Sequence, residues 1–202
     1  FFGESTIQHY PVFERLEIAT FQTVNAISTA GYNSIPLSNL TLGVLLTIIF
    51  LMYVGAAPSS TGGGMKITTL TAVIAIVKSK VRNQAKVTYL GKKIPADRLE
   101  MAVSTFIFYT AILFFSVFLL SFTENHSLEK LLFEATSAIG TVGLSMGITG
   151  SLSVWGKIIL ISIMFIGRVG VITFGLAILA KKQHKKIDNE TNQIKIMTQE
   201  EL

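Results

Sequence analysis

The chain has 202 residues, of which 50% are apolar and only 14% are charged, whereas ordinary soluble domains carry roughly 25% charged residues. The mean hydropathy is +0.57, and no acidic residue lies between Glu17 and Asp97 or between Glu134 and Asp188. This composition fits poorly with a disordered chain, a nucleic-acid-binding protein or a secreted disulfide scaffold. It predicts an integral membrane protein.

The net charge of +5 is concentrated in two clusters, each of which follows a long apolar stretch. Residues 78–98 hold seven of the seventeen basic side chains, and residues 181–202 hold five more. Basic residues beside apolar spans mark the cytoplasmic side of a membrane protein. We therefore expect a multi-pass protein of the cell membrane with a cytoplasmic connector at 78–98 and a cytoplasmic tail at 181–202.

The apolar stretches predict helices of two lengths. About 20 apolar residues are needed to cross the bilayer core, and the two segments 99–122 and 154–180 are long enough. The two segments 11–27 and 128–139 are too short. The stretch 42–77 is long, but glycine-rich residues interrupt it between Gly55 and Lys66, so we expect two half-helices joined by irregular backbone within the membrane.

An internal repeat orders these elements. When the chain is shifted by 112 residues, Thr29 falls on Thr141, Gly31 on Gly143 and the two segments align without a gap. Each copy is a short helix, a polar turn and a long helix, and a preceding spanning helix is present only in the second copy. This predicts four regions: 1–77 (short helix, turn and broken helix, with the first helix missing), 78–98 (connector), 99–180 (complete repeat) and 181–202 (tail). The missing helix, with the absence of an initiator Met, leads us to expect a fragment of a larger protein.

The two turns are the candidate ion-binding site. Neither contains an ionised group, so a cation would be coordinated there by backbone carbonyls. Glycine at the same place in each turn permits the backbone conformation that would point successive carbonyls toward one axis. The partly negative C-terminal end of each short helix also favours a cation. The two turns cover residues 28–33 and 140–145. The alternative is that the turns are ordinary helix caps.

The repeat resembles the Trk/Ktr/HKT superfamily of potassium transporters. The resemblance covers residues 11–180, as the third and fourth units of that family, and its most specific parts are the two turns, 60–66 and 91–95. It implies an all-α integral membrane fold built from helix–pore loop–helix units as in potassium channels, with one broken transmembrane helix. It also implies a carbonyl-lined selectivity filter for K⁺, with Na⁺ as a candidate activator and no resident cofactor. The filter residues that the resemblance implies are Thr29, Ala30, Gly31, Tyr32, Thr141, Val142, Gly143 and Leu144. The family's single pore needs four units, so the remaining two must come from upstream sequence or a second polypeptide. The resemblance further implies a homodimer and a cytosolic nucleotide-binding regulatory ring of the KtrA/TrkA kind.

The glycine-rich interruption is a candidate gate. A flexible loop beneath the filter could obstruct the pathway and move to open it. The residues assigned to this gate are Gly55, Ala56, Pro58, Thr61, Gly62, Gly63, Gly64, Lys66 and Arg168. The alternatives are a simple glycine-rich kink and, much more weakly, a phosphate-binding loop, which lacks the required Gly-Lys-Ser/Thr order.

Arg168 is a charge deep within the last spanning segment, where an arginine is costly. The repeat places it opposite Ala56, so its five donors could hold free carbonyls of the glycine loop. The alternative is that it extends to the cytoplasmic interface. Lys66 could likewise extend to that interface or join the gate.

Two other functions were weighed against potassium translocation. A secondary transporter that works by alternating access at the discontinuous helix needs a polar site at mid-membrane, and Arg168 is the only candidate for it. An intramembrane enzyme needs a nucleophile and base or metal ligands, and all three histidines lie outside the apolar spans. We therefore expect a transport protein that is not an enzyme.

Overall fold

The computed structural model describes residues 4–55, 62–83, 87–89 and 91–170. The described chain is helical except for one short hairpin. Its elements are α1 (Val12–Ser28), α2 (Leu42–Val54), α3 (Ile67–Val81), β1 (Thr88–Tyr89), β2 (Lys92–Lys93), α4 (Ala96–Thr123), α5 (Leu128–Ile139) and α6 (Val154–Val169). Short 3₁₀ turns cover Ser5–Ile7, Leu37–Asn39 and Thr149–Ser151.

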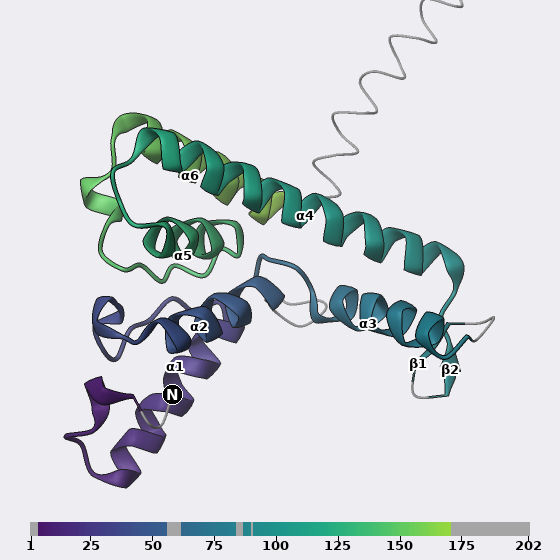
Figure 1. Cartoon of the computed structure of the whole chain (residues 1–202), viewed down its shortest axis with the longest axis horizontal. Helices are drawn as coiled ribbons and strands as arrows, with labels where there is room; N and C mark the ends of the chain where they lie inside the picture. Colours follow the sequence, from purple (N-terminus) through teal and green to yellow (C-terminus); the bar gives the residue numbers. More distant parts are fainter. Residues whose placement is uncertain (1–3, 56–61, 84–86, 90, 171–202) are drawn as a thin grey trace, which may run out of the picture.

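The long helix α4 runs along the molecule and organises the other helices (Figure 1). Helices α5 and α6 pack against one half of α4 and against each other, while α3 packs against the other half. Helix α2 packs against α5, and α1 packs chiefly against α2. The short helix α5 therefore lies in the middle of the bundle, and α1 lies at its edge.

The helices agree closely with the expected segments. Helix α5 has the predicted bounds, α1 begins one residue later than predicted, and α4 is long and apolar enough to cross a membrane. Among the described residues α4 alone meets that length criterion, and α2 is a shorter apolar helix. The last expected span, 154–180, is helical as far as Val169, and its remainder lies outside the described residues.

The region between the two repeats differs from the expected simple loop at 78–98. Helix α3 continues to Val81, and α4 already begins at Ala96. Lys78 and Lys80 lie in the last turn of α3, where positive charge interacts favourably with the helix dipole. Between the helices, β1 and β2 form an antiparallel pair in which Thr88 faces Lys93. Sequence reasoning missed this pair because two-residue strands leave no alternating pattern.

Two apolar clusters hold the bundle together. One joins α1, α2 and the second turn around Ile48 and Met52, and the other joins α4, α5 and α6 around Leu120 and Leu131. Helix α5 takes part in both, because Phe133 packs in the first cluster and Ile139 in the second. Burial of this helix thus ties the two repeats together.

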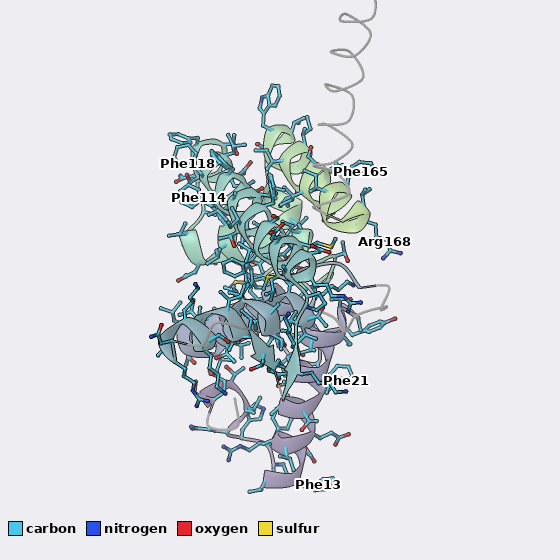
Figure 2. The ribbon with its side chains drawn as sticks, turned by 90° about the vertical axis from the view of Figure 1, so that its right-hand side faces the viewer. Phe13, Phe21, Phe114, Phe118, Phe165 and Arg168 are labelled. Carbon is cyan, nitrogen blue, oxygen red and sulfur yellow. The ribbon has the colours of Figure 1, made fainter. Side chains whose placement is uncertain are left out.

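Many large apolar side chains lie on the outside of the molecule. Phe13, Phe21, Phe114, Phe118 and Phe165 project outward from the ribbon (Figure 2), with exposed fractions between 46% and 78%. Extensive exposed apolar surface marks contact with a membrane or with other protein. The outer surface of the described bundle is therefore suited to lipid and to protein neighbours.

Candidate functional site: two turns and a glycine loop

The two polar turns have the same backbone conformation. Thr29 and Thr141 are left-handed, with φ of 58° and 51°, and Gly31 and Gly143 have φ of 79° and 89°. A left-handed threonine is uncommon because its β-carbon is branched, so two of them at equivalent positions are a strong sign of a common structure. The repeat seen in the sequence is thus present in the backbone.

Hydrogen bonds at the two turns also match. The N–H of Ala30 donates to the carbonyl of Asn25 at 3.3 Å, and the N–H of Val142 donates to the carbonyl of Ser137 at 2.9 Å. Both bonds reach back five residues, from the turn into the last part of the short helix. In each copy the helix end and the turn therefore form one unit.

The match continues beyond the turns. The backbone N–H of Ser34 donates to Gln22 at 3.4 Å, and the N–H of Met146, which is 112 residues later, donates to Glu134 at 3.0 Å. In both copies a side chain from the short helix holds the segment that leaves the turn. Asn25 adds two bonds in the first copy, because its amide donates to the Tyr32 carbonyl and its oxygen accepts from the Tyr32 N–H.

The structure brings the two turns into contact. A Cβ atom at Gly31 would lie 2.5 Å from the carbonyl oxygen of Val142 and 3.3 Å from the Cα of Gly143. A Cβ at Gly143 would in turn lie 3.4 Å from the Cα of Gly31. Any side chain at Gly31 would therefore displace the second turn, and glycine is required there by space as well as by its positive φ.

The described part of the glycine loop packs against the second turn. The N–H of Gly63 donates to the Thr141 hydroxyl at 2.9 Å, and a Cβ at Gly63 would lie only 2.5 Å from that oxygen. The Lys66 ammonium donates to the carbonyl of Gly62 at 2.7 Å. Lys66 therefore bonds to the loop itself. Ala56, Pro58 and Thr61, which the sequence assigned to the gate, lie outside the described residues.

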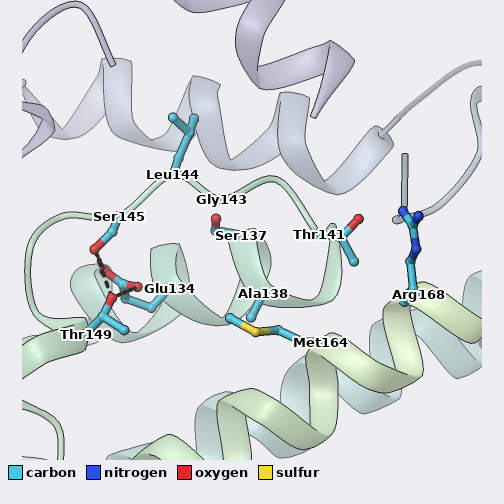
Figure 3. A pocket seen from close by; sticks show the side chains of 10 residues that line it. All are labelled: Glu134, Ser137, Ala138, Thr141, Gly143, Leu144, Ser145, Thr149, Met164 and Arg168. Carbon is cyan, nitrogen blue, oxygen red and sulfur yellow. Dashed lines mark hydrogen bonds between the residues drawn. The ribbon is translucent and has the colours of Figure 1, made fainter. Parts of the chain in front are cut away.

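Arg168 lies at a cavity of about 470 Å³ beside the second turn. Figure 3 shows Arg168 near Thr141 at one end of this cavity and Glu134 at the other end. The lining consists of Glu134, Ser137, Ala138, Thr141, Gly143, Leu144, Ser145, Thr149, Met164 and Arg168. Arg168 is thus placed beside the second turn, while the loop carbonyls nearest Ala56 fall outside the described residues.

Gly167, which the sequence reasoning did not assign to the site, controls how closely α6 approaches the second turn. A Cβ atom at this position would overlap the carbonyl oxygen of Ile139, at the end of α5. The absence of a side chain therefore lets α6 pass directly against the helix end that leads into Thr141. The signal for this residue was the alignment of Gly55 with Gly167, which on its own indicated only a repeated glycine.

Two carboxylates at the opposite end of the bundle from the basic connector were also missed. Glu4 accepts from the N–H of Thr41 at 3.1 Å, and Glu124 accepts from the N–H of Ser153 at 3.1 Å. Thr41 and Ser153 are 112 residues apart and precede α2 and α6, so each carboxylate caps an equivalent helix. The two glutamates are 120 residues apart, and an alignment without gaps could not pair them.

The bonds around Glu4 affect its ionisation. Burial would raise the pKa of the Glu4 carboxyl, but the bonds that Thr41 donates from its hydroxyl and N–H, with those from Thr6 and Ser5, lower the pKa below its ordinary value of 4.5. The ionised form is therefore the one that fits the folded structure.

A family model described as "TrkH: Cation transport protein" matches residues 1–189. The chain is 34% identical over 169 residues to the Ktr system potassium uptake protein B of Bacillus subtilis, covering 84% of this chain and 38% of that protein. It is 35% identical over 172 residues to the potassium/sodium uptake protein NtpJ of Enterococcus hirae, covering 83% of this chain and 38% of that protein. The chain thus spans less than two fifths of the length of these relatives.

The fold agrees with this relationship. The crystal structure of the potassium transporter TrkH from Vibrio parahaemolyticus is similar with a TM-score of 0.69, covering 86% of this chain and 39% of that one at 22% sequence identity. The match to the family model extends over nearly the whole sequence, and it includes both turns, the glycine loop and Arg168. The chain therefore belongs to the TrkH family of cation transport proteins, within the Trk/Ktr superfamily of membrane subunits.

Proposed function

We propose that this chain forms part of a potassium pathway across the cell membrane, in which the two turns supply carbonyl oxygens to a selectivity filter. The observation that carries the proposal is the contact between two turns of the same left-handed backbone, with Gly31 against the carbonyl of Val142. Two equivalent turns that meet can present their carbonyls to one ion. Ordinary helix caps have no reason to meet in this way.

The chemistry of the turns suits a monovalent cation. Residues 28–33 and 140–145 contain no ionised side chain, so peptide dipoles would replace the hydration shell of the ion. Weak, repeated coordination of this kind permits an ion to enter and to leave. The C-terminal ends of α1 and α5, which lead into the turns, add partial negative charge.

The relatives support potassium as the substrate. Ktr system protein B is a potassium uptake protein by name, and NtpJ is a potassium/sodium uptake protein. We extend this activity to the present chain as passive or sodium-assisted potassium translocation, with no covalent chemistry. Because the chain spans less than two fifths of these relatives, the proposed pathway is completed by two further units.

The glycine loop and Arg168 form the proposed gate. Gly63 is bonded to Thr141, so the described end of the loop already touches the second turn. Arg168 places a positive charge at the cavity beside the same turn, where it would oppose cation passage. The connector and its basic residues are the proposed surface for a cytosolic nucleotide-binding ring. These roles, like the homodimer, rest on the family resemblance.

The filter assignment is tested by Gly31→Ala in the complete transporter. The added methyl group would collide with the Val142 carbonyl, and we expect the preference for K⁺ over Na⁺ to fall about tenfold, an effect of about 1.4 kcal/mol. Uptake of both ions is measured in a cell that lacks its own potassium transport. Gly143→Ser, which introduces a side chain at φ 89°, should also reduce the preference.

Gly91→Ala is the matched control. Gly91 has a similar φ of 78°, but a Cβ there would meet no atom within 4 Å. The same backbone strain is therefore introduced in the connector, away from both turns. If Gly31→Ala and Gly143→Ser leave selectivity unchanged, or if Gly91→Ala alters it as much as they do, the filter assignment is wrong.

A further inference from the structure

A buried carboxylate lies directly behind the second turn. Glu134 on α5 is only 5% exposed, and it accepts three hydrogen bonds, shown in part in Figure 3. The donors are the Ser145 hydroxyl at 2.5 Å, the Met146 N–H at 3.0 Å and the Thr149 hydroxyl at 2.8 Å. All three donors lie at the end of the turn or just beyond it. A single side chain thus anchors this part of the chain to the short helix.

The equivalent position in the first repeat is built from weaker bonds. Gln22 is also buried, but it accepts only from Ser34, at 3.4 Å and 3.3 Å, and donates to the Asn33 side chain at 3.4 Å. The position equivalent to Thr149 is Leu37, whose side chain has no hydrogen-bond donor. Bonds to a charged acceptor are shorter and roughly twice as strong as neutral ones. The bonds at this position are therefore stronger in the second repeat, whereas the first turn has in addition the two neutral bonds between Asn25 and Tyr32.

We propose that Glu134 is a positioning residue for ion discrimination, fixing the carbonyls of Thr141 to Leu144 without touching the ion. This inference rests on the proposed filter. A turn whose exit is free to move can close around a smaller ion and coordinate it nearly as well as a larger one. A turn anchored by Glu134 cannot close in this way, so the second repeat enforces the preference for the larger cation.

The test uses Glu134→Gln in the complete transporter, because Gln22 shows that glutamine fits the equivalent site. The amide can still accept from Ser145 and Met146, but its nitrogen cannot accept the bond from Thr149. We expect the ratio of KM for Na⁺ to KM for K⁺ to fall roughly tenfold, as for the loss of a buried charged hydrogen bond. Maximal K⁺ uptake should change less than this ratio.

A double-mutant cycle separates positioning from general damage. Thr149→Val should lower the same ratio about threefold by leaving one carboxylate oxygen without its donor. The double variant Glu134→Gln/Thr149→Val should have the same KM ratio as Glu134→Gln alone. In Glu134→Gln the Thr149 hydroxyl no longer has a charged acceptor, so its removal causes no further loss. Residues in direct contact are expected to be non-additive in this way, and full additivity would contradict the proposal.

Glu129→Gln is the control for charge. Glu129 lies on the same helix, is exposed, and bonds to the Ser127 hydroxyl, so its removal changes the charge of α5 without touching the turn. Selectivity should remain at the wild-type value. An equal fall of the KM ratio in Glu129→Gln would show that negative charge on α5 sets the selectivity and that positioning of the turn does not.

Hydrogen exchange of residues 141–149 gives a second readout. Exchange in this segment should be faster in Glu134→Gln, and exchange in α4 should be unchanged. If Glu134→Gln exchanges faster but keeps its selectivity, or if neither its exchange nor its selectivity changes, the positioning role is wrong while the filter assignment stands. A wild-type protein without any preference for K⁺ over Na⁺ would instead overturn the filter itself, so the two failures are distinguishable.

Discussion

The two repeats have the same turn in different surroundings. In the second repeat, α5 is enclosed by α2, α4 and α6, and its residues 133–139 are all buried. In the first, α1 packs chiefly against α2, and Val12, Phe13 and Leu16 are more than half exposed. The turns still have similar φ values and share the backbone bond that reaches back five residues into the short helix. The comparison teaches that the conformation is set locally, by a helix end, a threonine and a glycine, because it is similar in both surroundings.

The long helices show the same contrast. Gly55 and Gly167 occupy equivalent positions, yet Gly55 ends α2 whereas α6 continues through Gly167 to Val169. In the second repeat the glycine lets the helix pass against the Ile139 carbonyl, and in the first it opens the chain into the loop. One residue type thus serves close packing in one copy and helix termination in the other.

The largest expected effect comes from Gly167→Ala. The new methyl group would overlap the Ile139 carbonyl at the end of α5, and such overpacking costs about 3 kcal/mol of unfolding free energy. The control is Gly43→Ala in α2, where nothing lies within 4 Å and alanine should be neutral or slightly stabilising. Unfolding in detergent micelles measures both. Equal stability of the two variants would show that the packing of α6 on α5 does not distinguish the repeats.

Arg168→Gln is expected to act on transport more than on stability. It removes the positive charge from the cavity beside Thr141, and the equivalent residue of the first repeat, Ala56, carries none. We expect ion flux to rise about tenfold, which corresponds to a decrease of about 1.4 kcal/mol in the free-energy barrier to ion passage. The response of the flux to the proposed cytosolic ring should become weaker. Lys157→Gln on the same helix, where the ammonium bonds to the exposed Gly150 carbonyl, should leave flux unchanged. Unaltered flux in Arg168→Gln would remove Arg168 from the proposed gate.

The smallest effect is expected for Glu4→Gln, at the cap of α2. The pKa of Glu4 is lowered by folding, so its contribution to stability is present above pH 4.5 and is lost as the pH falls through the folded pKa. The variant should be less stable than wild type by about 1 kcal/mol at pH 7, and this gap should narrow below pH 4.5. Thermal unfolding at pH 7 and pH 4 measures it. A stability difference between wild type and Glu4→Gln that is larger at pH 4 than at pH 7 would contradict the stabilising role of the ionised Glu4 carboxylate.

The equivalence of the two turns could be predicted because it is encoded locally. The pairing of Thr29 with Thr141 and of Gly31 with Gly143 follows from one shift of the sequence, and the paired residues have similar φ values. The helices are predictable because apolar length alone dictates them in a bilayer. Family membership follows from the same residues and is established by the matches across nearly the whole chain.

Other parts of the site depend on contacts between distant residues. The cap of α2 joins Glu4 to Thr41, and that of α6 joins Glu124 to Ser153 across a different spacing. The fit of Gly167 against Ile139 and the bond from Gly63 to Thr141 likewise leave no periodic signal. The small hairpin β1–β2 has too few residues for a recognisable pattern.

By itself the sequence determined the class of protein, the two equivalent turns and the interruption of the helix, since hydrophobic length, glycine placement and internal repetition are properties of the chain alone. Only the tertiary structure decided that the turns touch, that the glycine loop bonds to one of them, and that a buried carboxylate supports the second turn while an amide supports the first. These features depend on which surfaces pack together. Packing brings together residues that are far apart in the chain, and their spacing in the sequence shows no regular pattern.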